Sequence, residues 1–423
     1  MIPNRKELLP EVYLTYLPAH RFKTCLLSAH LVTGLDVSTA SLNALLPAVL
    51  RRGTMRCPDM QSLSAALDTL YGATIDYTLR KKGERQCIGF VANCIDDAYA
   101  PGGEQLLEPL ARLLGELLLD PVTRGGRFLS EYVESEKKNL TDAIRALRND
   151  KRDWAEVRLM QEMCAAEPYG VLRLGSEEAV AKLNNQKLYA HYQQLLASSR
   201  IEMFYSGTAP LERVEAAIRE AFAILPRGQV RHLAPMERRA APETPRIVTE
   251  AMEVTQGKLS MGWRCETDDT PAMVMANLLF GGTSNAKLFL NVREKLSLCY
   301  YASSAYVRSK GIMTVSSGIE VEDYDRALAE ILHQWEEIRE GHWEPWELEG
   351  ALATMASGLE ALPDSQGALE NFYLGQIATD CDETEQEFLA RLRAVTPERI
   401  RAAAQSARLD TVYFLKGKEQ SVC

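Results

Sequence analysis

Hydrophobic residues in the first half of the chain recur at two spacings, which predict strands and helices respectively. Alternation with a period of two predicts strands at 12–16, 24–32, 74–80 and 87–93. Recurrence every three to four residues predicts helices at 38–52, 58–70, 105–119, about 129–165 and 211–224. The first helix ends in Arg51, Arg52 and Gly53, a basic last turn followed by glycine. The first half is therefore predicted to mix helices and strands.

A segment of different composition separates the two halves. Residues 225–246 contain four prolines and five arginines without apolar periodicity, so a linker is predicted at 226–245. Beyond it, the apolar pattern predicts a strand at 258–263 and a helix at 271–280. The predicted domains are therefore 1–225 and 246–423.

A short repeat connects the halves. Residues 80–83 and 308–311 share the sequence Arg-x-Lys-Gly, and each copy follows a tyrosine and an extended segment. Each copy leads into a strand, an acidic turn and a long amphipathic helix. Four residues match easily by chance, but the common order of elements favours two homologous α+β domains.

Length and charge narrow the class of protein. With 423 residues the chain exceeds one ordinary domain, and 46% hydrophobic with 25% charged residues is a normal globular balance. The net charge of −10 argues against a nucleic-acid partner, because no basic surplus is available to neutralise phosphates. It allows basic peptides as ligands. No apolar run approaches the ~20 residues of a membrane helix.

The cysteines and the N-terminus predict a location. Nine cysteines without a Cys-x-x-Cys pair are typical of scattered thiols in a reducing compartment. Residues 1–11 are polar and contain proline, unlike an export signal. We therefore expect a cytoplasmic protein.

Residues 281–301 are predicted to form a turn, a short amphipathic helix and a strand. One face of the helix carries Phe289, Val292 and Leu296. Arg293 flanks that face, and a period of two begins at Tyr300, with residues 302, 304 and 306 on the same side. Taken alone, these residues favour a buried helix-to-strand corner with a solvated Arg293. A helix that turns into a strand can also bring Arg293 close to Tyr300.

This stretch resembles the second-domain signature of the insulinase/pitrilysin family of inverzincin metallopeptidases. The shared pattern is Gly-Gly-x-Ser, then Leu-Phe, then Arg-Glu-Lys-x-x-Leu-x-Tyr. The resemblance covers nearly the whole chain and implies two similar domains, each a mostly antiparallel sheet covered by helices. In that family an Arg and a Tyr bind the substrate peptide opposite the zinc. Those roles fall on Arg293 and Tyr300, supported by the loop residues Gly281, Gly282 and Ser284.

The same resemblance makes the zinc site the decisive question. Family peptidases hold zinc with His-x-x-Glu-His on a first-domain helix and a Glu on a later helix, which supply ligands and a general base. Counted back from Gly53, the two histidine positions fall on Ala44 and Ala48 and the general-base position on Pro47. The later ligand position falls near Ala143. These side chains offer no lone pair, so we expect this chain to hold no zinc or other cofactor.

Other candidate chemistry is weaker. Residues 333–337, His-Gln-Trp-Glu-Glu, approach a zincin motif but end in Glu, and a solvated helix face is the simpler interpretation. Cys299 would need a histidine base to act as a nucleophile, and a packed small residue is the simpler interpretation. The serines at 303, 304, 316 and 317 lack the Gly-x-Ser-x-Gly elbow.

The resemblance therefore implies a non-zinc-binding member that supplies the Arg/Tyr half of a split peptidase, as in heterodimeric bacterial peptidases. A homologous zinc-binding subunit would complete the site as a heterodimer, with a homodimer as the other arrangement, and a peptide would be the substrate. The alternative is a catalytically inert structural or peptide-binding subunit, like the related core subunits of respiratory complexes.

Overall fold

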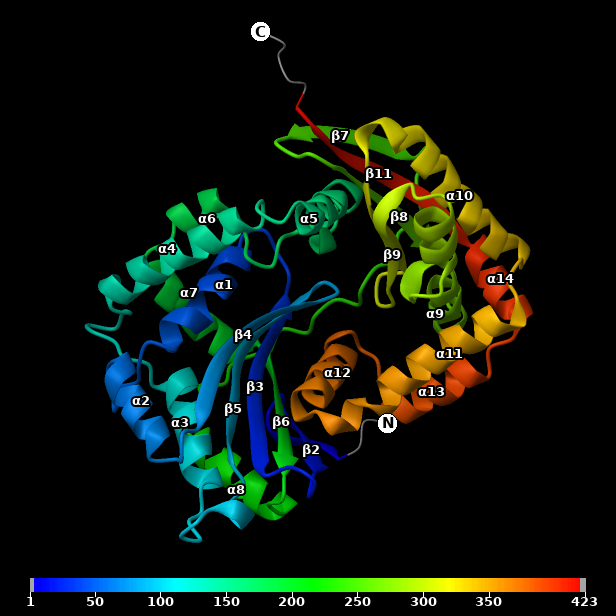
Figure 1. Cartoon of the computed structure of the whole chain (residues 1–423). Helices are drawn as coiled ribbons and strands as arrows, with labels where there is room; N and C mark the ends of the chain where they lie inside the picture. Colours follow the sequence, from blue (N-terminus) through cyan, green and yellow to red (C-terminus); the bar gives the residue numbers. More distant parts are fainter. Residues whose placement is uncertain (1–3, 419–423) are drawn as a thin grey trace. The chain divides into compact units, whose positions relative to one another are not determined.

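The computed structural model describes residues 4–418 (Figure 1). The chain forms two compact units, each assembled from separate stretches of sequence. The N-terminal unit takes residues up to 145, 171–235 and 363–384, and the C-terminal unit takes 146–170, 236–362 and 385 onward. The predicted ranges were 1–225 and 246–423. The segment 146–170 of the first range therefore belongs to the C-terminal unit, and the segment 363–384 of the second range belongs to the N-terminal unit.

Within the described residues, the N-terminal unit holds a six-stranded sheet in the order β1-β2-β6-β3-β5-β4. β2 and β6 run parallel, and the other neighbouring strands run antiparallel. The strands are β1 (Arg5–Leu9), β2 (Val12–Pro18), β3 (Thr24–Gly34), β4 (Thr74–Lys82), β5 (Arg85–Ile95) and β6 (Arg200–Gly207).

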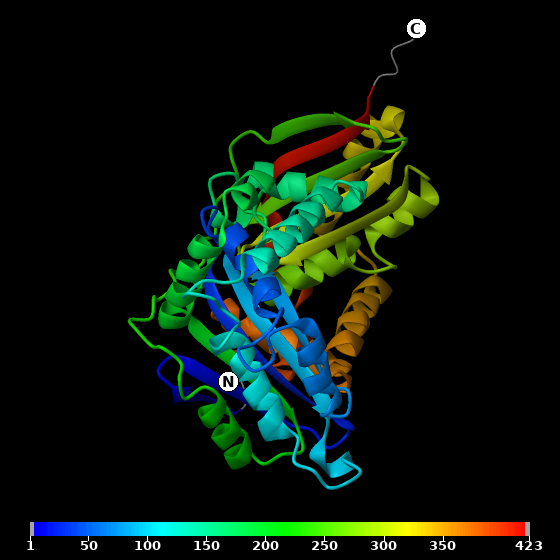
Figure 2. The same ribbon diagram turned by 90° about the vertical axis from the view of Figure 1, so that its left-hand side faces the viewer.

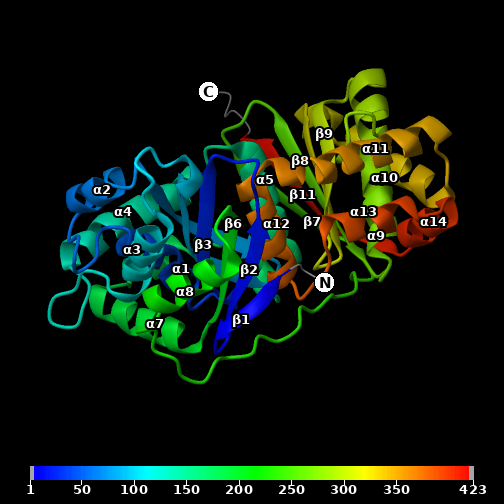
Figure 3. The same ribbon diagram turned by 90° about the horizontal axis from the view of Figure 1, so that it is seen from below.

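Helices cover both faces of this sheet. They are α1 (Ala40–Leu50), α2 (Met60–Asp68), α3 (Leu107–Leu119), α4 (Ser130–Ala146), α6 (Glu177–Ala181), α7 (Asn185–Ser198), α8 (Leu211–Ala221) and α12 (Gln366–Ala378). Alternation along β3 sends Leu27, Ala29 and Leu31 into the core with α1 and α3. His30 and Val32 face α12, which lies beside β3 and β6 (Figures 1 and 3). The helix that covers the second face thus comes from the C-terminal half of the sequence.

The C-terminal unit repeats the layout. Its described residues form a five-stranded sheet in the order β7-β11-β8-β10-β9. In Figure 2, β7 is green and its neighbour β11 is red. β7 and β11 run parallel and the other neighbours antiparallel, which reproduces β2-β6-β3-β5-β4 strand for strand. The strands are β7 (Arg246–Met252), β8 (Gly257–Cys265), β9 (Cys299–Val307), β10 (Ile312–Ile319) and β11 (Ala407–Gly417).

Helices also cover both faces of the second sheet. They are α5 (Lys151–Met163), α9 (Thr270–Asn277), α10 (Tyr324–Glu340), α11 (Pro345–Glu360), α13 (Glu385–Arg393), α14 (Pro397–Gln405) and the π-helices η3 (Leu278–Gly282) and η4 (Leu288–Lys295). Trp263 of β8 packs against Phe280 and Trp335 on one face. On the other face, Gly262 leaves room for the Met163 side chain of α5.

The α+β fold with two helix-covered, mostly antiparallel sheets is confirmed. The two Arg-x-Lys-Gly segments occupy equivalent β-hairpins, with Gly83 and Gly311 both at positive φ. The single helix predicted at about 129–165 is wrong. It is α4 followed by α5, because the Asp150 side chain caps a new helix by accepting from the backbone N–H groups of Arg152 and Asp153.

Residues 226–245, all of them described, form neither helix nor strand. Within this segment, the chain passes from the N-terminal unit to the C-terminal unit between residues 235 and 236. None of the helices in the described part of the chain combines the length and apolar character that a membrane span needs.

Candidate functional site

Helix α1 carries the positions where the family motif places its zinc ligands. Ala44 and Pro47 are buried and Ala48 is half-buried. Ala44 packs in the main core of the N-terminal unit with Leu45 and Leu46. Ala143 lies exposed on α4. Methyl groups and a proline ring supply no ligand atom for a divalent metal, so this set does not fit zinc.

A neutral hydrogen-bond network occupies the same helix. Pro47 lacks the backbone N–H that would bond to the carbonyl of Asn43. The Asn43 amide donates to Gln86 Oε1 at 2.7 Å, and its Oδ1 accepts from His191 Nε2 at 2.7 Å. Burial lowers the pKa of His191 to about 4, so the ring is neutral at pH 7. The sequence analysis missed this network, because its members lie 43 to 148 residues apart.

The predicted Arg/Tyr corner lies in the C-terminal unit, where η4 packs against β9. The predicted helical face is wrong in detail. Leu288 and Val292 are the buried residues of η4, whereas Leu296 is 40% exposed. Hydrogen bonds over five residues, such as Leu296 N–H to Asn291 O at 3.1 Å, widen the turn and rotate the buried face.

Tyr300 is 59% exposed at the start of β9, an edge strand of the sheet. A register shift against β10 separates the pairs Ile319–Cys299 and Gly318–Tyr301, so Tyr300 is the extra residue of a β-bulge. The predicted run of one-sided residues from Tyr300 is broken there. The Tyr300 hydroxyl donates to Glu320 Oε1 at 3.0 Å, and that bond with the Glu320 charge raises the pKa of Tyr300.

Arg293 lies on η4 with its side chain 40% exposed. Its guanidinium lies 4.6 Å from the centre of the Phe289 ring, and its Nε is 3.6 Å from Glu294 Oε1. Arg293 and Tyr300 therefore present polar donors from two packed elements of one unit. Each donor is held by a carboxylate of its own, Glu294 and Glu320.

The glycine-rich loop explains how η3 and β9 approach each other. A Cβ on Gly281 would lie 2.8 Å from the backbone nitrogen of Ser304 and 2.6 Å from Leu288 Cδ1. Gly281 is buried, whereas Gly282 and Ser284 are exposed. Gly281 is thus required by close packing, and Gly282 and Ser284 lie at the solvent side of the corner.

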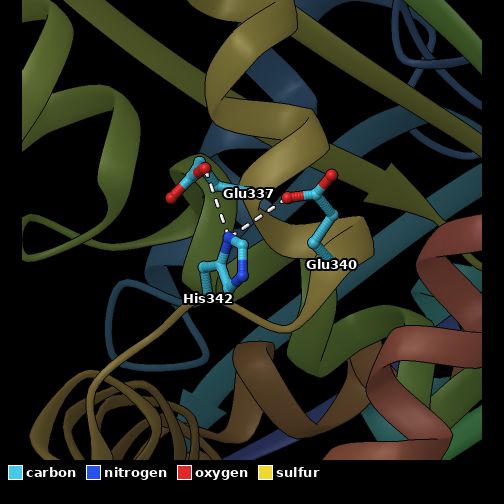
Figure 4. A group of neighbouring side chains, drawn as sticks. All are labelled: Glu337, Glu340 and His342. Carbon is cyan, nitrogen blue, oxygen red and sulfur yellow. Dashed lines mark hydrogen bonds and ion pairs between the residues drawn. The ribbon is translucent and has the colours of Figure 1, made fainter.

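Three further candidates are Cys299, the segment 333–337 and a group of possible metal ligands. Burial raises the pKa of the Cys299 thiol, which keeps it protonated. Trp335 packs in the core of the C-terminal unit. Within residues 4–418, the group with possible metal-ligand spacing is Glu337, Glu340 and His342 at the end of α10 (Figure 4). There His342 Nδ1 lies 3.3 Å and 3.2 Å from the two carboxylates.

Comparison with known proteins defines the family. The model of the peptidase M16 inactive domain matches residues 182–355. The probable inactive metalloprotease YmfF of Bacillus subtilis is 35% identical over 405 residues, which cover 94% of this chain and 94% of that protein. The chain therefore belongs to the M16 (insulinase) family.

Solved structures agree with this assignment. A conserved protein from Enterococcus faecalis V583 is 27% identical with a TM-score of 0.90, covering 99% of both chains. The peptidase M16 inactive domain from Pseudomonas fluorescens shares the fold, with a TM-score of 0.80 over 98% of both chains at 16% identity.

Proposed function

We propose that this chain is the non-zinc-binding subunit of a two-chain M16 peptidase and that Arg293 and Tyr300 contact the substrate peptide. One contrast carries the proposal. The ligand positions of α1 and α4 are alanine and proline, whereas the arginine and tyrosine of the family signature remain, half-buried and exposed respectively.

In the proposed complex, a homologous partner's zinc supplies an activated water that attacks the peptide carbonyl. Negative charge then develops on the carbonyl oxygen. The Tyr300 O–H and the Arg293 N–H groups are donors that stabilise such a charge or hold the peptide backbone. For either role, the Tyr300 hydroxyl must exchange Glu320 for the peptide, whereas the Arg293 guanidinium has further N–H groups beside the Nε that faces Glu294.

A second function is favoured by that same pairing. Because both side chains already contact carboxylates, they also fit an inert structural or peptide-binding subunit, in which the corner is closed by the Tyr300–Glu320 hydrogen bond and the Arg293–Glu294 ion pair. This alternative predicts that the corner does not affect cleavage by any complex.

The experiment mixes the chain with a zinc-binding M16 homologue from the same source and follows peptide cleavage and co-sedimentation. Arg293→Ala should lower kcat/KM about 10²-fold or more while leaving assembly intact. The matched control is Arg326→Ala, because Arg326 forms an exposed pair with Asp323 at 2.7 Å in the same unit. Equal cleavage by the two assembled variants favours the structural alternative.

A further inference from the structure

An open hollow of about 630 Å³ lies in the C-terminal unit beside the Tyr300 corner. It is formed where the β7–β8 connection, the start of α5 and the end of β11 come together. Its chemically distinctive lining residues are Lys151, Lys258, Lys418, Glu253, Gln256 and Val254. Three ammonium groups against one carboxylate make this lining positive in a protein whose net charge is −10.

Two lysines of this hollow are bonded to neutral groups. Lys151 Nζ donates to the Arg148 carbonyl at 2.5 Å, and Lys258 Nζ lies 3.4 Å from Gln256 Oε1. Among residues 4–418, no carboxylate oxygen lies within ion-pair distance of the Nζ of Lys151, Lys258 or Lys418. Burial is the largest cause that lowers the pKa of Lys258 and Arg152 lowers it further, whereas the charges of Asp150 and Glu320 raise it and compensate the ammonium in part. An anion in the hollow would add direct contacts to the lysine ammonium groups.

Gln256 connects the hollow to Tyr300. Its amide accepts from Lys258 on one side, and on the other it lies close enough to Tyr300 to lower the pKa of that phenol, against the larger raising effect of Glu320. A peptide bound at Tyr300 would therefore have the lysines of the hollow as neighbours across Gln256. The volume exceeds that of a single ion and falls in the range of sites for small organic ligands, and Val254 adds an apolar wall.

We propose that this hollow binds a carboxylate of a peptide, carried by an acidic side chain or by the peptide's C-terminus. The shared chemistry is an oxyanion received by lysine ammonium groups. The identity of the ligand as a peptide rests on the proposed function of Tyr300. The preference for a carboxylate does not, because it is a property of this chain alone.

The test measures binding of fluorescent peptides to the full chain without a zinc-binding partner, at about 50 mM salt, where surface charges are weakly screened. Three peptides of one sequence carry a C-terminal carboxylate, a C-terminal amide, or an amide with one internal Asp. We expect a carboxylate of either kind to lower Kd about tenfold relative to the plain amide, as three weak ammonium contacts would give. The two carboxylate peptides tell the two sources apart.

The variant Lys151→Gln/Lys258→Gln/Lys418→Gln should lose this preference. The control variant Lys23→Gln/Lys138→Gln/Lys182→Gln removes the same charge from exposed lysines of the N-terminal unit and should keep it. Equal Kd values for the three peptides, or an unchanged preference in the first variant, would overturn the proposal. Inorganic phosphate that displaces the carboxylate peptide as well as free aspartate does would also overturn it, as a general anion site.

The outcome is separable from that of the proposed function. If the carboxylate preference is present but Arg293→Ala cleaves like the parent in the mixed complex, the proposed function fails and the hollow stands. If the preference is absent but Arg293→Ala abolishes cleavage, the hollow fails and the proposed function stands.

Discussion

The two units of this chain share strand order and strand direction, yet they differ at the positions where the M16 family places its chemistry. In the N-terminal unit, α1 has its motif positions inside the packed structure, with Ala44 only 6% exposed. In the C-terminal unit, Tyr300 is 59% exposed on an edge strand, and Arg293 lies on the neighbouring π-helix. The predicted motif positions on α1 are thus buried or half-buried and carry no ligand atoms, whereas the predicted Arg/Tyr pair has polar donors that are half-buried and exposed.

A further likeness between the units makes this difference informative. Each sheet receives a helical segment from the other half of the sequence, and each segment carries a buried carboxylate. Glu370 contacts His30 Nε2 at 2.6 Å and Arg80 Nη1 at 2.5 Å, and Glu167 contacts Arg264 Nη2 at 2.5 Å and Lys310 Nζ at 2.9 Å. Both units thus join the exchanged segment to their sheet through a buried carboxylate.

The largest expected effect concerns the N-terminal unit. Because Ala44, Pro47, Ala48 and Ala143 offer no ligand atoms, purified protein should hold no stoichiometric zinc and cleave no peptide by itself. Elemental analysis after dialysis and a fluorogenic peptide assay measure both. One tightly bound zinc per chain would contradict this account of the N-terminal unit, since other residues would then have to bind the metal.

The next effect concerns the buried carboxylates. Glu370→Gln and Glu167→Gln should each lower the free energy of unfolding by about 3 kcal/mol or more, because each removes a buried negative charge that pairs with two basic side chains. Glu336→Gln, in an exposed pair with Arg339, should change it by less than about 0.5 kcal/mol. Urea unfolding of the three variants provides the measurement. If either buried variant behaves like Glu336→Gln, the two units are not held by equivalent ion pairs.

Acid should weaken the N-terminal unit at two sites. The pKa of His191 is depressed to about 4, so the folded state disfavours its protonation and stability falls as pH drops from about 6.5 towards 4. Burial acts to raise the pKa of Glu370, but His30 and Arg80 outweigh it and hold the value at about 2. That contribution is present above pH 4.5 and is lost as pH falls towards 2.

The two pH ranges in which stability is lost can be separated with the variant His191→Gln. This variant should lose the stability change between about pH 6.5 and pH 4.5, which amounts to the order of 2–3 kcal/mol in the parent. Urea unfolding at a series of pH values, with parent and variant side by side, measures it. An unchanged pH profile in the variant would show that His191 does not titrate as its burial requires.

The smallest effect concerns the packing of the Arg/Tyr corner. Gly281→Ala should lower the free energy of unfolding by about 1–3 kcal/mol, because its methyl group would meet the Ser304 backbone. Gly350→Ala, on α11 with nothing within 4 Å, should raise it by about 0.5–1 kcal/mol. Thermal unfolding of both variants decides. Equal responses would mean that the corner is loosely packed, which would weaken the argument for a preformed site.

Local sequence patterns predicted the class of fold, because apolar residues recur every second position in the strands and every three to four positions in most helices. The Arg-x-Lys-Gly repeat also marked equivalent hairpins. The exchanged segments could not be predicted in this way. Which sheet α5 or α12 covers depends on partners such as Glu370 and His30, which lie 340 residues apart. The break before α5 was readable in principle, since Asp150 is a good N-cap residue inside an otherwise continuous helical pattern.

At the site, spacing and residue identity placed Arg293 and Tyr300 in one unit on adjoining elements. They did not predict the π-turns of η4 or the bulge at Tyr300, because both arise from hydrogen bonds that a helical or alternating pattern does not encode. Glu320, the partner of Tyr300, lies in the acidic turn that follows the second strand of the repeat. Its contact with Tyr300 becomes visible only once β9 and β10 are paired.

The most direct test of the contrast between the units uses two matched tyrosines. Tyr300 donates to Glu320 at 3.0 Å in the C-terminal unit, and Tyr71, 46% exposed, donates to Glu104 at 2.7 Å in the N-terminal unit. In the reconstituted complex with a zinc-binding homologue, Tyr300→Phe should lower kcat by roughly 10²–10³ while Tyr71→Phe leaves it unchanged. Assembly should be intact for both. If Tyr300→Phe assembles and cleaves like Tyr71→Phe, the exposed corner is not part of a peptidase site.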